Sequence, residues 1–237
     1  MRSFNTMRYK VVIFDLFGTL VPYLCKQEYE NMLEEMTASL SISRSPFQKL
    51  WDDTFVERAR GVFSTIESNI LHICEALRIK PDRAQIEAAT RRRIEFIRRA
   101  LAPREDAVET ICRLKSSGRK IGLISDCSCE VPLLWKGTPL SELIDEAVFS
   151  CEVLITKPNP QIYLLACDRL GISPEDCLYV GDGGSSELSG AAEVGMSPVL
   201  IRVPGEDTGD GYRMNAGEWE GQTISALSEV LPLVFDH

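Results

Sequence analysis

The sequence predicts an α/β protein whose core is a doubly wound parallel sheet, with an all-α domain inserted after the first strand. Two observations predict this class. First, three short apolar runs begin at a charged or polar residue and end in an aspartate, at residues 10–15, 120–126 and 177–182. Second, residues 21–102 carry helical patterns and no strand signal. Strands that alternate with helices are typical of a parallel sheet, and a long helical stretch between two of them indicates an insertion.

The apolar runs are too short for helices and rich in β-branched residues, which is typical of buried parallel strands. Two weaker strands are predicted at 146–150 and 198–203. The helical patterns between the strands each lead into a glycine suited to a helix C-terminus, with helices at 105–116, 160–170 and 187–194 followed by Gly118, Gly171 and Gly195. This alternation predicts right-handed crossovers between parallel strands.

The stretch without strands contains four helical patterns, at residues 26–39, 46–60, 65–79 and 82–100. We therefore predict an α/β core from residues 1–20 and 103–237, and a helical cap domain from residues 21–102. An insertion after the first strand lies beside the carboxyl ends of the strands, where open α/β sheets bind ligands. Within the cap, the basic run Arg91–Arg93 is interpreted as a solvated helix face, and Trp51 and Phe55 as cap interior.

Composition narrows the class of partner. The chain has 237 residues, a net charge of -9 and a pI of about 4.9, which argues against nucleic acid and leaves a small-molecule substrate. No apolar run is long enough for a membrane span and no signal peptide is evident, so we expect a cytoplasmic protein. Eight scattered cysteines without a CxxC pair, and two histidines, argue against a zinc site or a disulfide scaffold. No feature indicates an oligomeric state.

Polar side chains stand where the predicted strands end. Asp15, Asp126 and Asp182 follow three different strands, and Ser125 precedes the second aspartate. The carboxyl ends of parallel strands meet at one edge of a sheet, so these groups are expected to lie close together. Crowded carboxylates repel one another, and a divalent cation with hard oxygen ligands removes that cost. The pattern therefore predicts a Mg²⁺ site.

Four motifs in this order resemble those of the haloacid dehalogenase-like superfamily. They are Asp15-Leu-Phe-Gly-Thr19, Ser125, Lys157-Pro-Asn-Pro160, and Gly181-Asp182 followed by Glu187. The resemblance covers nearly the whole chain and implies a hydrolase with a Rossmann-like core and a helical cap. It also implies that Asp15 is a nucleophile that forms a covalent intermediate, which water later cleaves.

The resemblance further implies a role for each motif residue. The metal would be held by the carboxylates of Asp15 and Asp182 and by the backbone carbonyl of Phe17, with Glu187 acting through water or through the ligands. Gly18 would allow a sharp turn, and the hydroxyls of Thr19 and Ser125 would bind phosphoryl oxygens. Lys157 would balance the charge of the nucleophile and the substrate. Thr19 and Ser125 could instead cap helices, and for Asp126 we expect only capping or hydrogen bonding within its loop.

One residue departs from the pattern of the superfamily's phosphatases. These enzymes usually carry an acid–base aspartate two residues after the nucleophile, where this chain has Phe17. Such acid–base help is worth about 10²–10⁴ in rate. A dehalogenase does not need it, because a halide leaves without a proton, and the superfamily's dehalogenases carry an aromatic residue there and no metal. The metal-type fourth motif, Asp182 with Glu187, favours a phosphatase acting on a small phosphorylated metabolite.

Three alternatives stay open beside the phosphatase. A 2-haloacid dehalogenase would act on a halogenated substrate. A phosphonatase-like enzyme would need a cap lysine for a Schiff base, with Lys26 or Lys49 as candidates. A catalytically silent member would bind a phosphorylated ligand or a partner without turning it over.

Overall fold

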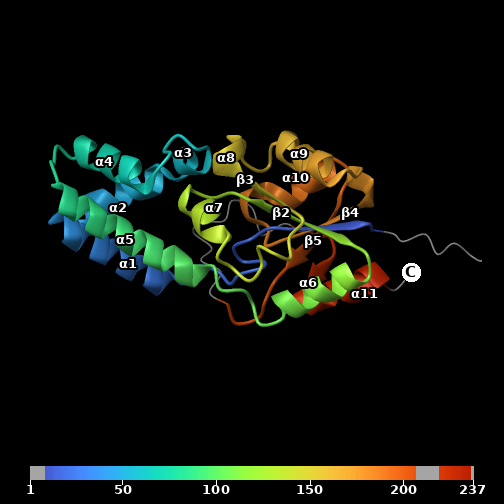
Figure 1. Cartoon of the computed structure of the whole chain (residues 1–237). Helices are drawn as coiled ribbons and strands as arrows, with labels where there is room; N and C mark the ends of the chain where they lie inside the picture. Colours follow the sequence, from blue (N-terminus) through green and yellow to red (C-terminus); the bar gives the residue numbers. More distant parts are fainter. Residues whose placement is uncertain (1–8, 207–218, 236–237) are drawn as a thin grey trace, which may run out of the picture.

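The computed structural model describes residues 9–206 and 219–235, and its core is a six-stranded parallel sheet in the order β3-β2-β1-β4-β5-β6 (Figure 1). The strands are β1 Val11–Phe14, β2 Lys120–Ser125, β3 Glu146–Phe149, β4 Cys177–Gly181, β5 Ser197–Ile201 and β6 Thr223–Ile224. The chain builds outward from β1 first to one side, through β2 and β3, and then to the other, through β4 to β6. This confirms the doubly wound sheet, whose direction of winding reverses between β1 and β4.

Alternation along β1 explains why helices cover both faces of the sheet. Val11 and Ile13 belong to the apolar cluster that includes α9 and α10, whereas Val12 and Phe14 belong to the larger cluster that includes α6 and α11. Figure 1 shows these two pairs of helices on opposite sides of the sheet. The core helices are α6 Ala107–Ser116, α7 Glu130–Trp135, α8 Ser150–Val153, α9 Pro160–Leu170, α10 Glu187–Glu193 and α11 Val230–Phe235, with short 3₁₀ turns at Pro174–Asp176, Gly184–Ser186 and Leu227–Glu229.

Five helices between β1 and α6 form a separate group, which we call the helical insertion (Figure 1). They are α1 Lys26–Leu40, α2 Arg44–Asp53, α3 Phe55–Ala59, α4 Ile66–Ala76 and α5 Arg83–Ala100. The helix predicted at residues 46–60 is two helices that meet at Thr54, whose hydroxyl donates back to the carbonyls of Leu50 and Trp51. We keep residues 21–102 as the proposed bounds of the cap domain, and 1–20 with 103–237 as those of the core, of which 1–8, 207–218 and 236–237 lie outside the described residues.

The helical insertion contacts the core through α5 and α3. Arg93 of α5 forms an ion pair with Glu130 at the start of α7, with 2.7 Å between Nη2 and Oε1. Next to α3, a Cβ atom on Gly61 would lie 2.2 Å from the carbonyl oxygen of Cys151 in α8, so the two backbones touch. The interpretation of the basic run as a solvated face is therefore wrong for Arg93, which is buried because it reaches a carboxylate on the core, while Arg91 and Arg92 are exposed.

The two aromatic residues assigned to the cap interior have different surroundings. Trp51 is buried and stacks on Phe47, as predicted, but Phe55 is half exposed, because α3 begins a new helical direction after Thr54.

All eight cysteines are free thiols. Among the residues that the structure describes, no helix has both the length and the apolar character needed to cross a membrane.

Candidate active site

The carboxyl ends of β1 and β4 carry the two aspartates that begin the site. These neighbouring central strands are apolar and buried along their whole length, so their first polar residues stand at the edge of the sheet. Asp15 follows β1, and its backbone N–H donates to the carbonyl of Val180 in β4 at 2.9 Å. Asp182 follows β4 directly. Both aspartates thus lie at the point where the winding of the sheet reverses, which is where such sheets form ligand sites.

Three buried carboxylates meet at this point. Asp15, Asp182 and Glu187 each place one oxygen so that these atoms lie within 4.8 Å of one another. Glu187 begins α10, and the turn Gly184–Ser186 brings it back over Asp182. The structure thus brings together the three acidic side chains that the sequence assigned to a metal.

Lys157 is the cation that the structure places among these carboxylates. Its Nζ lies 2.6 Å from Oδ1 of Asp15 and 2.5 Å from Oε2 of Glu187. Its backbone N–H donates to Oδ1 of Asp126 at 3.0 Å, so this aspartate fixes the loop that carries the lysine. The sequence predicted only capping or hydrogen bonding within the loop of Asp126 itself, whereas this bond joins two different loops.

Glu187 is held by more partners than the sequence indicated. Oε2 accepts from the hydroxyl of Tyr179 at 2.7 Å as well as from Lys157, and Oε1 accepts from the N–H of Gly183 at 2.9 Å. The hydroxyl of Tyr163 donates to the backbone carbonyl of Glu187 at 3.0 Å. Sequence reasoning missed both tyrosines, because an aromatic residue within an apolar strand or helix resembles core. Glu187 therefore positions Lys157 directly.

Burial and mutual repulsion dominate the electrostatics of the site. Burial raises the pKa of Asp15 well above its usual range, against the opposing effect of Lys157. Burial and the neighbouring Glu187 raise the pKa of Asp182 to about 7. Burial lowers the pKa of Lys157, but the carboxylates of Asp15 and Glu187 outweigh it, so the pKa stands well above its ordinary value. Three carboxylates around one ammonium leave an excess of negative charge.

A divalent cation fits this donor set at the two aspartates. Of the oxygens of Asp182, Oδ1 accepts from the N–H of Gly184 at 2.7 Å. Oδ1 of Asp15 faces Lys157, and Oδ2 accepts only a long hydrogen bond of 3.5 Å from Thr19 among the described residues. Buried hard oxygens with excess negative charge are what Mg²⁺ prefers. Glu187 already accepts at both oxygens, which suits it to the indirect role expected from the sequence.

The loop after Asp15 needs glycine at position 18. Gly18 has a φ of 77°, and a Cβ there would lie 2.4 Å from Cε1 of Tyr23 and 2.5 Å from Oδ2 of Asp182. This close approach lets the loop pass between a phenol ring and a carboxylate. The buried guanidinium of Arg104 holds the same loop from behind, donating to the carbonyl oxygens of Gly18 at 2.9 Å and Thr19 at 2.7 Å and pairing with Glu206. Sequence reasoning missed Arg104, which stands two residues after the proposed end of the cap domain.

The predicted substrate-binding hydroxyls lie on the same edge of the sheet. Ser125 ends β2 beside β1, and its Oγ is buried without a hydrogen-bond partner among the described residues. Thr19 is fully buried, and neither hydroxyl caps a helix in the structure. Phe17 is half buried and packs against the larger apolar cluster, so its ring brings no proton donor to the site.

Comparisons with known proteins show which family the sequence matches. Residues 9–195 match the model of the haloacid dehalogenase-like hydrolase family. (S)-2-haloacid dehalogenase 4A of Burkholderia cepacia is 31% identical over 134 residues, which cover 54% of each chain. Glyceraldehyde 3-phosphate phosphatase of Methanopyrus kandleri is 34% identical over 105 residues, covering 43% of this chain and 44% of that one. The chain thus spans about half, or less, of the length of these curated relatives.

Solved structures share the fold over nearly the whole chain. A HAD phosphatase from Thermococcus onnurineus superimposes with a TM-score of 0.66 at 21% identity, covering 95% of this chain and 98% of that one. A doubly wound sheet with an acidic site at its switch point defines an α/β protein whose ligand site lies at the carboxyl ends of the strands. The protein belongs to the haloacid dehalogenase-like hydrolase family.

Proposed function

We propose that the protein is a Mg²⁺-dependent phosphatase of small phosphorylated metabolites, with Asp15 as its nucleophile. The observation that carries this proposal is the meeting of Asp15, Asp182 and Glu187 within 4.8 Å around one lysine. A dehalogenase has no use for a buried excess of carboxylates, whereas a phosphatase needs a cation to receive a phosphoryl dianion.

Each residue of the site has its own role in the proposed reaction. A carboxylate oxygen of Asp15 attacks phosphorus and forms an aspartyl phosphate, while the bond to the bridging oxygen breaks and the leaving alkoxide takes a proton from water, because Phe17 offers none. A water molecule then attacks the phosphorus, which restores Asp15 and releases inorganic phosphate. Lys157 stabilises the charge on the nucleophile and on the transferred group, and Glu187 keeps the ammonium in place. The hydroxyls of Thr19 and Ser125 donate to phosphoryl oxygens. When bound by Asp15, Asp182 and the carbonyl of Phe17, Mg²⁺ supplies charge neutralisation.

Release of phosphate tests the proposal. The wild-type protein should hydrolyse p-nitrophenyl phosphate only with Mg²⁺, and Asp15→Asn should abolish the activity. The leaving nitrophenolate needs no proton, so this substrate does not depend on the aspartate that Phe17 replaces. Phosphate release that continues undiminished in EDTA, or in Asp15→Asn, contradicts the proposal.

Phe17 supports dehalogenation of a short 2-halo acid as a second candidate function, and one of the relatives is a 2-haloacid dehalogenase. This candidate predicts chloride release from 2-chloropropionate in the presence of EDTA. The variant Phe17→Asp separates the two functions. It should raise phosphate release from an alkyl phosphate by about 10²-fold if the missing acid–base group limits a phosphatase, and leave a dehalogenase no better at releasing phosphate.

The other two alternatives receive less support. A phosphonatase-like reaction needs a neutral cap lysine near Asp15, but Lys26 is exposed, and the exposed ammonium of Lys49 pairs with Asp53. A silent member would release neither phosphate nor chloride, yet Mg²⁺ would still raise its melting temperature.

A further inference from the structure

Four of the eight free thiols form two close pairs in the interior. The sulfurs of Cys127 and Cys151 lie 4.0 Å apart, and those of Cys167 and Cys177 lie 3.9 Å apart. All four residues are buried. Two thiols in contact can lose two hydrogens to an oxidant and become a disulfide, provided that their backbones lie at a suitable distance. Each pair can therefore be examined as a site of reversible oxidation.

The sheet places the backbones of the first pair at such a distance. Ser125 of β2 is the register partner of Phe149 in β3, and Cys127 and Cys151 each stand two residues after these partners. The hydroxyl of Ser150 accepts from the backbone N–H of Cys127 at 3.0 Å, which ties the two segments together just past the strands. Neighbouring strands lie about 4.8 Å apart, within the Cα–Cα separations that disulfides span. A bond between the two sulfurs therefore needs only small movements of the backbone.

Cys151 is the more reactive thiol of this pair. The hydrogen bond from Cys127 lowers the pKa of Cys151, whereas burial raises the pKa of Cys127 well above its ordinary value. Because the thiolate is the form that attacks an oxidant, Cys151 reacts first. Cys151 is also the more exposed of the two residues, at 8% against 3%. Cys129 does not compete, because burial and the neighbouring Glu130 raise its pKa to about 12.

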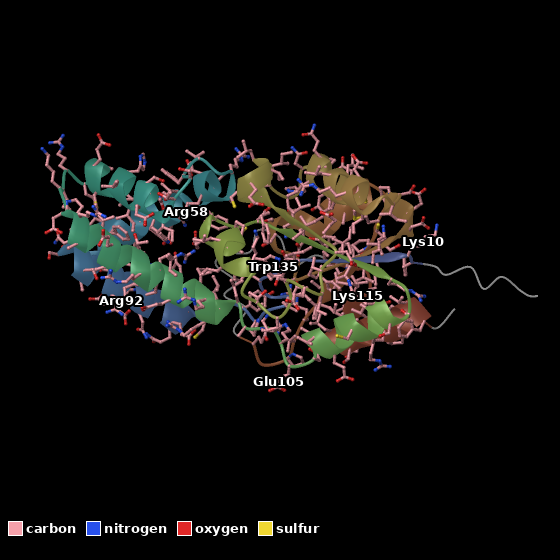
Figure 2. All side chains as sticks on the ribbon, in the orientation of Figure 1. Lys10, Arg58, Arg92, Glu105, Lys115 and Trp135 are labelled. Atoms are coloured by element: carbon pink, nitrogen blue, oxygen red, sulfur yellow. The ribbon has the colours of Figure 1, made fainter. Side chains whose placement is uncertain are left out.

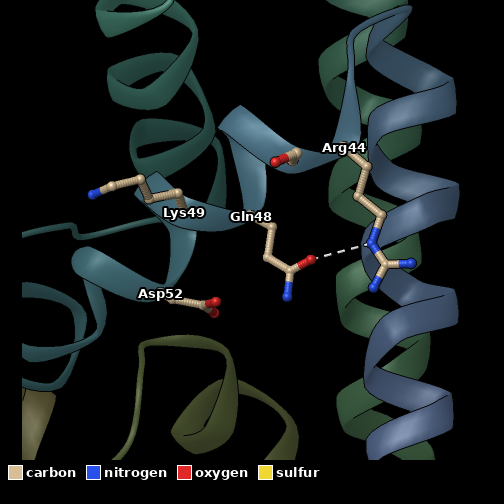
Figure 3. Close-up of a pocket in the computed structure, with 5 residues that line it drawn as sticks. Arg44, Gln48, Lys49 and Asp52 are labelled. Atoms are coloured by element: carbon tan, nitrogen blue, oxygen red, sulfur yellow. Dashed lines mark hydrogen bonds between the residues drawn. The ribbon is translucent and has the colours of Figure 1, made fainter.

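The surroundings of the pair select a small, uncharged oxidant. Both thiols belong to the larger apolar cluster, together with Phe149 and with Trp135 at the end of α7 (Figure 2), whose rings meet edge-on with 5.8 Å between their centres. The open cleft of about 390 Å³ along α2 (Figure 3) lies in the helical insertion, and no cysteine lines it. Apolar surroundings exclude charged molecules. A hydroperoxide as small as hydrogen peroxide therefore suits this pair better than a large, charged disulfide does.

Closing the pair moves groups that the active site depends on. A disulfide brings the two sulfurs from 4.0 Å to about 2.05 Å. Movement of Cys127 is passed to its neighbour Asp126, whose carboxylate accepts from the backbone N–H of Lys157. Movement of Cys151 is passed to the helical insertion, because the backbone of α8 touches that of Gly61. Close-packed interiors transmit such shifts, and a misplacement of about 1 Å costs on the order of 10²-fold in rate.

We propose that Cys127 and Cys151 form a reversible disulfide in the presence of a hydroperoxide, and that this bond lowers the activity of the enzyme. The effect on phosphate release rests on the proposed function, whereas formation of the bond does not. The pair is thus a modification site at the second strand tip of the active site.

Two steps form the bond. The thiolate of Cys151 attacks the hydroxyl oxygen of the hydroperoxide and becomes a sulfenic acid, while the O–O bond breaks and the leaving alkoxide or hydroxide takes up the proton that Cys151 gave up. The sulfur of Cys127 then attacks the sulfur of the sulfenic acid, and the sulfenic oxygen leaves as water with the proton of Cys127. Two thiols are oxidised and one hydroperoxide is reduced. A dithiol such as dithiothreitol reverses the change by exchange.

The second pair provides the matched control. Cys167 lies on α9, and Cys177 begins β4, at the opposite end of that strand from Asp182. The two pairs have nearly the same sulfur–sulfur distance, so they offer the same chemistry at different places in the sheet. Wild type is therefore compared with Cys151→Ala and Cys167→Ala. Each variant removes one sulfur from one pair and keeps the two exposed cysteines.

Each protein is treated with a small excess of hydrogen peroxide, which catalase then removes. Peptide mass spectrometry should find the linkage between Cys127 and Cys151 in wild type and in Cys167→Ala. Hydrolysis of p-nitrophenyl phosphate should fall about tenfold or more in these two proteins, and dithiothreitol should restore it. Cys151→Ala should form no such linkage and keep its activity. A second variant, Cys127→Ala, should behave in the same way.

Absence of the linkage in oxidised wild type, a linkage that leaves activity unchanged, or an equal loss of activity in Cys151→Ala overturns the proposal. If reduced wild type releases no phosphate, the proposed phosphatase function fails, and hydrogen exchange then decides the disulfide alone. The linkage should speed exchange at the backbone N–H of Lys157 about tenfold or more, because it moves the acceptor Asp126. Equal exchange in the reduced and the oxidised protein overturns the proposal.

Discussion

The ion pair between Arg93 and Glu130 predicts how strongly the helical insertion is fastened to the core. Both side chains are buried, at 8% and 2% exposure, and Oε1 of Glu130 accepts from Nε and Nη2 of Arg93 and from the hydroxyl of Ser128. Glu130→Ala leaves the guanidinium buried and uncompensated. Removing one partner of a buried pair costs about 3–5 kcal/mol, so we expect the free energy of unfolding to fall by that amount.

Urea denaturation at pH 7 measures this loss, and the double variant Arg93→Met/Glu130→Ala provides the control. With neither charge left behind, the double variant should recover most of the stability that Glu130→Ala loses. A loss below about 1 kcal/mol in Glu130→Ala, or a double variant as unstable as the sum of the two single ones, would refute the reasoning.

The pH dependence of stability in a further variant, Glu130→Gln, gives an independent check. Burial raises the pKa of Glu130, but Arg93 and Ser128 outweigh it, so the pKa lies below its ordinary value of 4.5. The unfolded chain therefore binds a proton at Glu130 more readily than the folded one. The stabilisation that this ion pair contributes to the folded state is present above about pH 4.5 and is lost as the pH falls through the lowered pKa of Glu130. The difference in stability between wild type and Glu130→Gln should shrink in that window, and a constant difference would contradict this account.

Three further predictions concern the acidic site. Lys157→Met should lower the stability of the Mg²⁺-free protein by about 3 kcal/mol, because three carboxylates lose their cation, and in a thermal-shift assay Mg²⁺ should raise its melting temperature more than that of wild type. Tyr179→Phe should lower the free energy of unfolding by about 2 kcal/mol in urea denaturation, because the lost hydroxyl donates to a carboxylate. Tyr163→Phe should lower it by about 1 kcal/mol, because the lost hydroxyl donates to a neutral carbonyl, and equal losses would contradict this reasoning. Gly18→Ala should reduce turnover about 10²-fold, because its Cβ meets two side chains, whereas Gly118→Ala, with a φ of 84° and no atom within 4 Å, should keep its activity and lose about 1 kcal/mol of stability.

Much of the fold could be predicted because local signals were strong. The helix at 160–170 was placed at its observed bounds, since Asn159 caps its first turn and Gly171 ends it in the left-handed conformation. The short helices α7 and α11 were missed, because six residues carry too little periodicity to distinguish a helix from a loop. Arg93 was misassigned, since its charge favours solvent until a carboxylate from the core comes within reach.

The candidate site was predictable where it depends on topology and not where it depends on packing. Strand ends of a parallel sheet meet at one edge, which was enough to bring Asp15 near Asp182. Nothing local indicated that Lys157 would bind Glu187, or that the hydroxyl of Tyr179 would donate to the same oxygen. These contacts arise only when α10 folds back over β4.

The backbone N–H of Arg104 donates to the carbonyl of Leu20 at 3.0 Å, so the chain returns from its helical excursion at the place where it departed. Residues 21–103 therefore form a closed loop, because this hydrogen bond joins its two ends at the core. Lengthening, shortening or exchanging such a loop costs little closure entropy. The length and sequence of this loop can therefore change while the strands that carry Asp15 and Asp182 stay as they are.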